Sequence, residues 1–449
     1  MNRLNLILKA AAVGFLTLLL LIPLQMINGT IAERQGYRQQ AVESVAQSFA
    51  GAQDLVGPVL VLPFEDETEV VSKNDKGVES REKLITPGRW LYFPETLDLQ
   101  GRLQPNIRHR GLHEVRVYEL QMQLNSRFHA SVPMPPSAQV IRRLGQPYLS
   151  FSIADVRGLA GSPTLRIDGR PQLLKQGPGE VREGSGIHAS MPAVQPGQML
   201  DFTVEFAAAL GGTETLAIAP IARSNRITLD SSWPHPNFAG RFLPHASKID
   251  PHGFHAVWEI SSLAAATQTQ YQSGQAAGAL DGMELTLIEP VNIYSQADRA
   301  SKYGFLFVAL TFTGFFMFEL IKRLAIHPIQ YGLVGLALAI FFLLLISLSE
   351  HIEFWQAYLV ASVACIGLLA VYLSAVLKSR KRGAAFAAML TLLYAALYGL
   401  LVSEDNALVL GSLMLFVILS AIMLITRRID WYALGRDAAL PPIPASEHV

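Results

Sequence analysis

The sequence predicts a membrane protein of the α+β class, in which six transmembrane helices (one N-terminal, five C-terminal) carry a large inserted β-sandwich-like domain. Three observations predict this class. Hydrophobic residues make up 51% of the 449-residue chain and are concentrated in one block near the start and in a long tract after Lys302. The segment between these blocks has the mixed composition of a globular domain, with Pro and Gly at short intervals. The formal net charge is zero, so nothing in the overall charge suggests nucleic-acid binding.

The first predicted span runs from Ala10 to Ile31, with no charged residue between Lys9 and Glu33. A membrane-crossing helix needs about 20 mostly apolar residues, and this stretch is long enough. A cleaved signal peptide is the competing interpretation, but its apolar region would be only about 7–15 residues long and would end in a small-x-small site. No such site is seen in Gln25–Ile31. Residues 1–31 are therefore expected to form a cytoplasmic N-terminus and a retained signal anchor.

Residues 303–428 are expected to form a bundle of five more transmembrane helices. Each predicted span is an apolar run of about 20 residues, and short charged segments separate the runs. The predicted spans are Tyr303–Ile321, Ile329–Leu348, Phe354–Leu377, Gly383–Val402 and Ala407–Thr426. Small residues on several spans would let helices approach closely in lipid, which favours a packed bundle. Residues 429–449 follow as a predicted cytoplasmic tail.

The charges between the predicted spans orient the chain, because Lys and Arg near span ends mark the cytoplasmic face. One side of the predicted membrane carries Arg3, Lys9, Lys322, Arg323, Lys378, Arg380, Lys381, Arg382, Arg427 and Arg428. The other side carries Glu350, Glu353, Glu404 and Asp405. Both termini are therefore predicted to be cytoplasmic and residues 32–302 periplasmic, in a multi-pass protein of a bacterial inner membrane.

Two chemically reactive side chains lie within the predicted bundle. Cys365 is the single cysteine of the chain, which excludes an intrachain disulfide and a Cys-rich metal site. Glu319 is the one carboxylate within a predicted span, and a helix-end pair with Lys322 at the cytoplasmic interface is its expected role. A proton relay is the alternative, because intramembrane ionisable groups are often functional. The sequence offers no partner for Glu319 deep in another span.

Residues 32–302 are expected to form a mainly β domain. Glu33–Gln53 has the composition of a helix leading out of the membrane, and Gly57-Pro58 is expected to end this helix before the first strand. Short apolar or alternating segments then follow one another between turns, the pattern of one or two sandwich-like units. The strand candidates are Val59–Phe64, Lys83–Ile85, Leu91–Phe93, Glu114–Leu120, Leu149–Ile153, Thr164–Ile167, Leu200–Phe206, Leu216–Pro220, Arg226–Leu229, His255–Ile260 and Met283–Leu287.

An aromatic and Pro-rich segment is the candidate interaction loop of this domain. Its residues are Trp233, Pro234, His235, Pro236, Phe238, Phe242, Phe254 and Trp258. Aromatic side chains on a loop can form a binding surface. They can equally cover an edge of the sheet, and this packing role is the simpler expectation.

Four histidines fall in the same region: His235, His245, His252 and His255. Their spacing is not that of a helical zinc motif, and Pro residues between them place them on loops, so solvated or packing histidines are expected. A metal site and a pH-sensing role are the alternatives. No serine nucleophile elbow, phosphate-binding loop or dinucleotide fingerprint occurs in the sequence. The sequence therefore predicts no catalytic residue, no metal ligand and no cofactor.

Three stretches carry a resemblance to a known family. They are Ile22-Pro23-Leu24 through Ile31 with Arg34 and Gly57-Pro58-Val59-Leu60; Leu229-Asp230-Ser231-Ser232-Trp233-Pro234-His235-Pro236-Asn237-Phe238 through Pro244 with Gly253-Phe254-His255-Ala256-Val257-Trp258; and Ala407-Leu408-Val409-Leu410-Gly411-Ser412 through Thr426-Arg427-Arg428-Ile429-Asp430-Trp431-Tyr432. In these stretches the chain resembles the CreD family of inner-membrane proteins, named for cell-envelope integrity. The resemblance implies one N-terminal span, a periplasmic domain, a C-terminal bundle and a link to envelope stress, including β-lactam exposure. It implies no catalytic residues.

Three functions remain open from the sequence. The first is a non-enzymatic protein of envelope maintenance or stress response, whose outer domain binds a partner protein, a glycan or a lipid. The second is a transporter or lipid-handling protein, which predicts a polar cavity in the bundle reached by Gln25, Glu319 or Thr311. The third is a periplasmic metalloenzyme, which requires three of the four histidines to converge. The lipid bilayer is an expected partner in all three, and the oligomeric state is not predicted.

Overall fold

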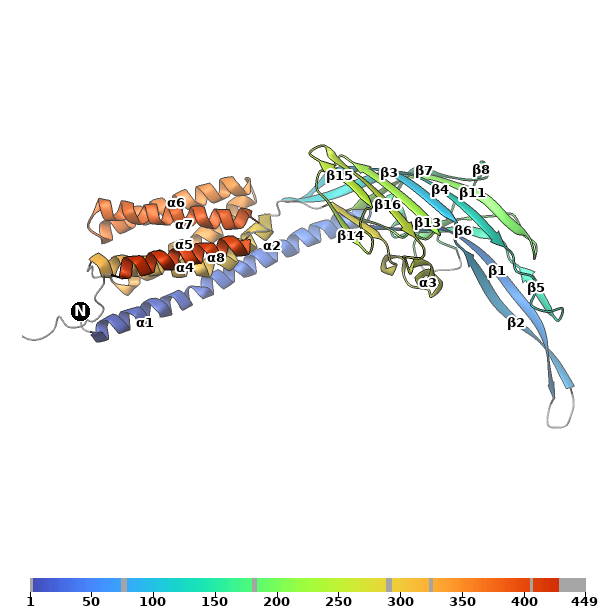
Figure 1. The fold of residues 1–449 in the computed structure, drawn as a ribbon, viewed down its shortest axis with the longest axis horizontal. Helices are drawn as coiled ribbons and strands as arrows, with labels where there is room; N and C mark the ends of the chain where they lie inside the picture. The colour runs from blue at the N-terminus through green and yellow to red at the C-terminus, as the bar shows by residue number, and fades with distance from the viewer. Residues whose placement is uncertain are drawn as a thin grey trace, which may run out of the picture. The chain divides into compact units, whose positions relative to one another are not determined.

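The computed structural model describes residues 3–73, 79–179, 184–287, 293–322, 326–403 and 407–427. The chain divides into two compact units: a helical unit formed by Met1–Tyr37 with Val291–Val449, and a β unit, Arg38–Pro290 (Figure 1). The predicted acidic pair at Glu404 and Asp405 and the predicted tail at 429–449 lie outside the described residues.

The helical unit is built from apolar helices. They are α1 (Arg3–Leu19), α2 (Leu21–Ser48, of which the part up to Tyr37 belongs to this unit), α4 (Ile293–Lys322), α5 (Pro328–Ser349), α6 (Phe354–Val376), α7 (Arg380–Val402) and α8 (Ala407–Thr426). Within the described residues, five helices are long and apolar enough to cross a membrane: α1 with α2 taken as one helix, then α4, α5, α6 and α7. The sixth predicted span coincides with α8, whose apolar described part is Val409–Leu424. The predicted class, a membrane protein of helices and a β-rich insertion, is confirmed.

The N-terminal span is interrupted between α1 and α2. The break lies at Leu20, and Pro23 follows three residues later. A proline inside a helix lacks an N–H and its ring clashes with the carbonyl four residues earlier, here that of Leu19. Leu20 and Leu24 still donate to the carbonyls of Leu16 and Leu20, at 3.0 and 3.3 Å, so the axis continues past the break.

An aromatic core holds the bundle together. Phe307, Phe341 and Tyr394 make edge-to-face contacts, with Phe307 and Phe341 ring centroids 4.6 and 4.7 Å from that of Tyr394. The Tyr358 hydroxyl donates to the Tyr394 carbonyl at 2.7 Å, and the Tyr394 hydroxyl lies 3.1 Å from Cys365 Sγ. The single cysteine is thus a buried packing residue in this core.

The β unit consists of two sheets. Its elements are β1 (Gln53–Lys73), β2 (Glu79–Tyr92), β3 (Thr96–Arg110), β4 (His113–Ser131), β5 (Val140–Leu144), β6 (Tyr148–Ile153), η1 (Val156–Gly158), β7 (Leu159–Ile167), β8 (Arg170–Gln172), β9 (Lys175–Gln176), β10 (Gly186–Ser190), β11 (Met199–Thr213), β12 (Thr215–Ile218), β13 (Ser224–Ser231), β14 (Pro236–Gly240), β15 (Ala246–Asp250), β16 (Gly253–Ser261), α3 (Thr267–Gln272), η2 (Ala277–Ala279) and β17 (Met283–Leu287). One sheet of nine strands has the order β14-β17-β12-β1-β6-β10-β9, with β2 and β5 also paired to β1. The other, of eight strands, has the order β15-β16-β13-β3-β4-β11-β7-β8.

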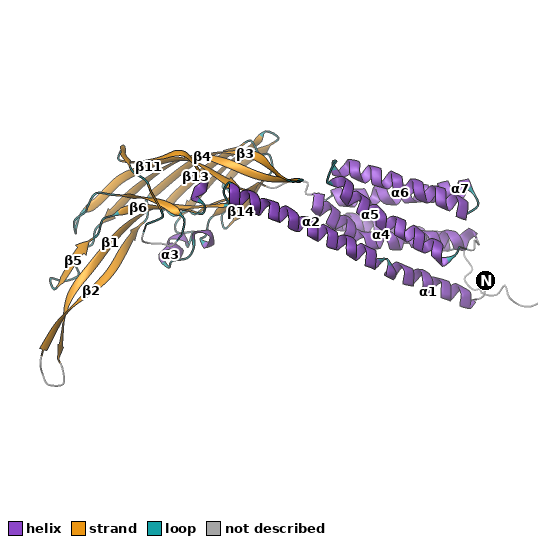
Figure 2. Cartoon of the chain, turned by 180° about the vertical axis from the view of Figure 1, so that it is seen from behind, coloured by secondary structure: helices purple, strands orange, loops and turns teal. Residues whose placement is uncertain are grey.

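The two sheets share one hydrophobic core, as a sandwich requires. Figure 2 shows their strands as separate layers. Phe151 of the nine-stranded sheet and Phe206 of the eight-stranded sheet are both buried, with ring centroids 4.7 Å apart. Along β4, buried and exposed side chains alternate as they do on a strand with one face in a core.

The first strand is longer than predicted. The helix α2 ends at Ser48 rather than Gln53, and β1 runs without interruption from Gln53 to Lys73 through Gly57-Pro58. Gly57-Pro58 was expected to separate a helix from a strand, and this expectation is wrong. Instead the dipeptide lies at a register shift, because the pairing of β1 with β6 is interrupted between Val56 and Val59. A proline is tolerated at such a bulge because a bulged residue is left unpaired in the ladder, and proline has no N–H to donate there.

The end of α2 is fixed to the β unit. Ala41, Val42 and Val45 pack against Val115 and Val117 of β4. Beyond them, the Arg157 guanidinium donates to the carbonyls of Ala46 and Gln47, the last turn of the helix. These contacts satisfy backbone carbonyls that would otherwise have no partner at a helix C-terminus.

Candidate functional site

The predicted aromatic loop lies at one edge of the sandwich. Phe254 and Trp258 on β16 are buried, at 4% and 1% exposure. Phe238 on β14 packs edge-to-face on both, with ring centroids 5.6 and 5.5 Å away. The Trp258 indole N–H donates to the Phe242 carbonyl at 3.1 Å. Because β14 and β16 lie at or next to the edges of their sheets, these rings close the core there, as the packing interpretation predicts.

The remaining residues of this loop lie nearer the surface. Trp233, Pro234 and Pro236 are half-buried and His235 is exposed. The Trp233 indole N–H donates to the His235 carbonyl at 2.9 Å, and the Arg116 guanidinium lies 5.0 Å from the Trp233 ring. A binding role for this part of the loop stays a prediction.

The four histidines of this region do not meet at one point. All four side chains are exposed, and His255 Nδ1 lies 2.8 Å from Asp230 Oδ1. Among the residues that the structure describes, no group of three or more His, Cys, Asp or Glu side chains could hold a metal ion. The convergence that a metalloenzyme requires is therefore not found among these histidines.

A groove of about 910 Å³ lies on the face of the nine-stranded sheet that points away from the sandwich core. Side chains along β1 alternate between the two faces: Leu62 is buried in the core, while Pro63 and Glu65 line the groove. Pairing places Arg89 of β2 opposite Pro63, and Arg143 of β5 opposite Glu65.

The far wall of the groove comes from β6 and β10. There Ser190 pairs with Tyr148, and His188 with Ser150. His188 Nδ1 lies 2.7 Å from the Gly177 carbonyl, and its ring is edge-on to that of Tyr148. Gly179 lies against the Tyr148 ring with a φ of 85°, and a Cβ there would come within 2.2 Å of the ring. Only glycine allows this close approach.

An aromatic and ionic clamp connects the strands of the groove, and one of its residues, Phe64, also lines the groove. The Phe64 and Trp90 rings stack with centroids 4.0 Å apart. The Arg142 guanidinium lies 4.9 and 4.7 Å from these rings and makes two hydrogen bonds to Asp66, at 2.7 and 2.6 Å. These bonds hold the pKa of the Asp66 carboxyl below its usual value. Because Phe64 and Asp66 are on β1, Trp90 on β2 and Arg142 on β5, the clamp ties three strands together.

The groove is lined by two arginines, Arg89 and Arg143, and by one carboxylate, Glu65, so positive charge outnumbers negative charge there and favours an anionic ligand. Arg143 donates to Glu67 at 3.0 Å through one nitrogen, which leaves other guanidinium N–H groups available. Within the described part of the chain, Arg89 forms no ion pair, and its side chain is exposed. Arg guanidinium groups bind carboxylates and phosphates through paired hydrogen bonds. Sequence reasoning missed this groove because strand pairing, not local spacing, brings Arg89, Arg143 and His188 together.

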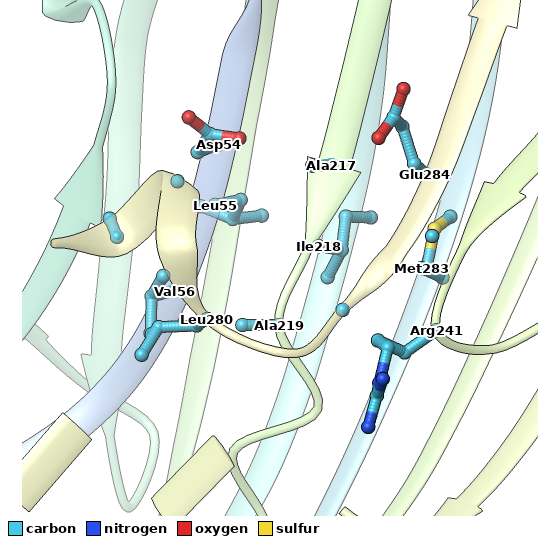
Figure 3. A pocket seen from close by; sticks show the side chains of 14 residues that line it. Asp54, Leu55, Val56, Ala217, Ile218, Ala219, Arg241, Leu280, Met283 and Glu284 are labelled. Atoms are coloured by element: carbon cyan, nitrogen blue, oxygen red, sulfur yellow. The ribbon is translucent and has the colours of Figure 1, made fainter. Parts of the chain in front are cut away.

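A second, smaller pocket of about 120 Å³ lies at the base of β1 (Figure 3). Asp54, Ala217 and Glu284 stand in one row across three strands, so the two carboxylates face each other over Ala217. Burial, and then the Glu284 charge, raise the pKa of Asp54. Water occupies roughly 30 Å³ per molecule in the liquid, so this pocket has room for a few waters rather than a polymer.

In the helical unit, Glu319 is 5% exposed and held at the α4–α5 connection. Its carboxylate accepts hydrogen bonds from the Tyr331 hydroxyl at 2.7 Å and the Ile326 N–H at 3.2 Å. Tyr331 belongs to α5, but it lies in the first turn of that helix, so the contact is at a helix end rather than deep in another span. The Lys322 side chain predicted to pair with it lies outside those that the structure describes.

The other two groups of the transporter interpretation do not share a polar cavity. The Thr311 hydroxyl is buried and donates to the Phe307 carbonyl of its own helix at 2.8 Å. Gln25 is exposed and lines a hollow of about 620 Å³ with residues of α2 and α4.

Comparisons with known proteins cover nearly the whole chain. Residues 5–432 match the family described as "Inner membrane protein CreD". The chain is 36% identical over 434 residues to "Inner membrane protein CreD" of Escherichia coli (strain K12), covering 96% of this chain and 94% of the relative. Among solved structures, an M1 zinc metallopeptidase from Deinococcus radiodurans matches with a TM-score of 0.18 at 7% identity, and a yeast hydrolase in complex with Bestatin with 0.19 at 9%. These matches cover 43% and 45% of this chain and 42% and 30% of the solved chains, and at such TM-scores they carry no argument.

Proposed function

The chain belongs to the CreD family of inner membrane proteins, and from this premise we propose that it is a non-enzymatic protein of cell-envelope integrity whose β unit captures an anionic ligand outside the cytoplasm. The single observation that carries the proposal is the groove of about 910 Å³ on the free face of the nine-stranded sheet. Arg89, Arg143 and His188 line this groove together with one carboxylate, Glu65, and with apolar side chains such as Val61 and Leu144.

The charges at the ends of the helices support a β unit outside the cytoplasm, and therefore a ligand there. The positive-inside rule puts Arg3, Lys9 and the basic cluster at Lys378 on the cytoplasmic side. Arg34 of α2 and Glu350 at the end of α5 form an ion pair of 3.4 Å within the helical unit. This contact joins the middle of α2 to the C-terminal end of α5, two positions that the charge pattern assigns to the outer face.

The chemistry of the groove favours a glycan that carries carboxylate groups. Arg89 and Arg143 suit carboxylates, while Gln146, Ser190 and His188 offer further hydrogen-bonding groups beside the Tyr148 ring. The groove crosses the face of a sheet, a kind of surface on which other β folds bind oligosaccharides. A peptide that added a strand would instead need a free sheet edge. An acidic segment of a partner protein is the competing occupant.

Charge reversal in the full-length chain tests this proposal. A strain that lacks the gene would be supplied with the wild type, with Arg89→Glu/Arg143→Glu, or with the control Arg102→Glu/Arg166→Glu. The control arginines are exposed on the eight-stranded sheet. Survival would be scored under detergent and a β-lactam, with membrane abundance measured for each variant.

We expect the groove variant to lose rescue and the control to retain it. Each lost charge-assisted hydrogen bond is worth about 1.5–3 kcal/mol, so ligand affinity should fall by tenfold or more. Full rescue by the groove variant at wild-type abundance would refute the proposal.

A further inference from the structure

A seam between the N-terminal span and α4 contains two hollows in the helical unit. The first has a volume of about 450 Å³, and the second about 620 Å³. The first is lined by Val13, Gly14, Thr17 and Leu18 of α1 with residues of α4, and the second by residues 21–28 of α2 with Ser301 and Lys302 of α4. Phe305 lines both, so the hollows adjoin. Both volumes fall within the roughly 300–1,000 Å³ typical of small-molecule sites.

The first hollow presents an apolar surface. Its two hydroxyl-bearing residues, Thr17 and Thr313, donate to the carbonyls of Val13 and Ala309 in their own helices, both at 2.8 Å. Their hydroxyl hydrogens are therefore not offered to a ligand. Leu18 is 60% exposed beside them, which in a membrane is a lipid-facing position. This hollow suits a hydrocarbon chain.

The second hollow has polar residues with unused hydrogen-bonding capacity. Ser301 is 4% exposed, and among the described residues neither its Oγ nor the buried Asn28 Oδ1 has a hydrogen-bond partner. A buried polar atom without a partner is costly and rare in native structures. Lys302 stands beside them, and its ammonium lies 2.6 Å from Asp298 Oδ2.

We propose that this seam binds one phospholipid of the bilayer, with an acyl chain in the first hollow and a headgroup that donates hydrogen bonds in the second. Asn28 Oδ1 can only accept, so it requires an N–H or O–H donor from the ligand. The Ser301 hydroxyl can donate to a phosphate or ester oxygen, and the Lys302 ammonium complements the phosphate charge. Ethanolamine and glycerol headgroups carry such a donor, whereas choline carries none. The inference does not rest on the groove of the β unit.

Lipid competition on the purified full-length chain tests the proposal. The protein would be incubated with equal amounts of dioleoyl phosphatidylethanolamine, phosphatidylglycerol and phosphatidylcholine, and retained lipids counted by native mass spectrometry. The variants are Asn28→Leu/Ser301→Ala, which removes both polar groups, and Gly14→Leu, which fills the first hollow. A Cβ at Gly14 meets nothing within 4 Å, so the new side chain can start into the hollow without displacing the backbone. The matched controls are Ser412→Ala on the exposed side of α8 and Gly367→Leu on α6, where a Cβ also meets nothing.

We expect the wild type to retain a donor-bearing lipid over phosphatidylcholine by at least about fivefold, the effect of one hydrogen bond. Preference for ethanolamine or for glycerol identifies which donor is used. The Asn28→Leu/Ser301→Ala variant should bring the ratio close to one, and Gly14→Leu should reduce retention of all three lipids, while both controls match the wild type. Equal retention of all three lipids by the wild type, or an unchanged pattern in either seam variant, would overturn the proposal.

Discussion

Asp155 joins two segments of the β unit through one carboxylate. It accepts hydrogen bonds from the Gly51 N–H at 3.0 Å and the Arg157 N–H at 3.1 Å, and it pairs with the Arg157 guanidinium. The Gln53 side chain adds bonds to the Asp155 backbone at 2.9 and 3.1 Å. The hydrogen bond from Arg157, and then that from Gly51, lower the pKa of Asp155 from 3.8 to about 2.

The pH dependence of unfolding should therefore reveal Asp155. Its pKa is lower in the folded state, so its contribution is present above pH 3.8 and is lost as the pH falls towards about 2. With allowance for solvent screening of the exposed Arg157, we expect Asp155→Asn to lower the free energy of unfolding by about 1–2 kcal/mol at pH 7 and by much less near pH 2. Thermal unfolding followed by tryptophan fluorescence measures it. The control Asp201→Asn, which breaks an exposed pair with Arg127, should cost less than about 1 kcal/mol. A loss that stays constant down to pH 2 would contradict the assignment.

At the scale of elements, the α4–α5 connection depends on Glu319. The helix α5 starts with His327 as its N-cap, Pro328 in the first turn and Gln330 completing a capping box. Glu319 adds a bond to the Ile326 N–H just before this cap and a bond to Tyr331 just after it. These contacts fix the angle at which α5 leaves the connection, a structural role that differs from a proton relay.

Two substitutions separate these roles. In Glu319→Gln the amide oxygen can still accept from Ile326 or Tyr331 but cannot carry a proton, so we expect abundance, thermal stability and rescue close to wild type. Glu319→Leu leaves the Ile326 N–H without this acceptor, which should lower stability by about 1–3 kcal/mol and reduce membrane abundance. Abundance, thermal stability in detergent and complementation would be measured for both. Loss of rescue in Glu319→Gln at normal abundance would instead favour the relay.

The elements that the sequence predicts best are those whose signal is local. Span length and flanking charge locate the helices, but α4 begins at Ile293, before the predicted start at Tyr303, because a helix continues into water where hydropathy no longer marks it. Gly57-Pro58 is a local break signal that pairing with β6 overrides. Phe254 and Trp258 were identified from composition, yet only the fold shows that they face the core.

At the scale of the whole molecule, the groove could not be predicted from the sequence alone. Arg89 reaches it through the pairing of β2 with β1, Arg143 through β5, and His188 through β10 and β6. Register between strands distant in sequence follows from the buried faces of all of them together. Histidines that are clustered in the sequence, such as His245 and His252, do not meet in the structure. The groove residues Arg89, Arg143 and His188, which no sequence spacing connects, do meet.

Site-specific photo-crosslinking in living cells tests most directly whether the groove is occupied by a ligand. A benzophenone amino acid would replace Gln146 in the groove or Arg166 on the eight-stranded sheet of the full-length chain. We expect an adduct at Gln146 that is absent at Arg166, diminishes in Arg89→Glu/Arg143→Glu, and disappears after digestion with a glycan-cleaving enzyme. An adduct removed only by protease would identify an acidic partner protein instead of a glycan. Equal labelling at the two positions, or none at Gln146, would contradict a ligand-binding groove in the β unit.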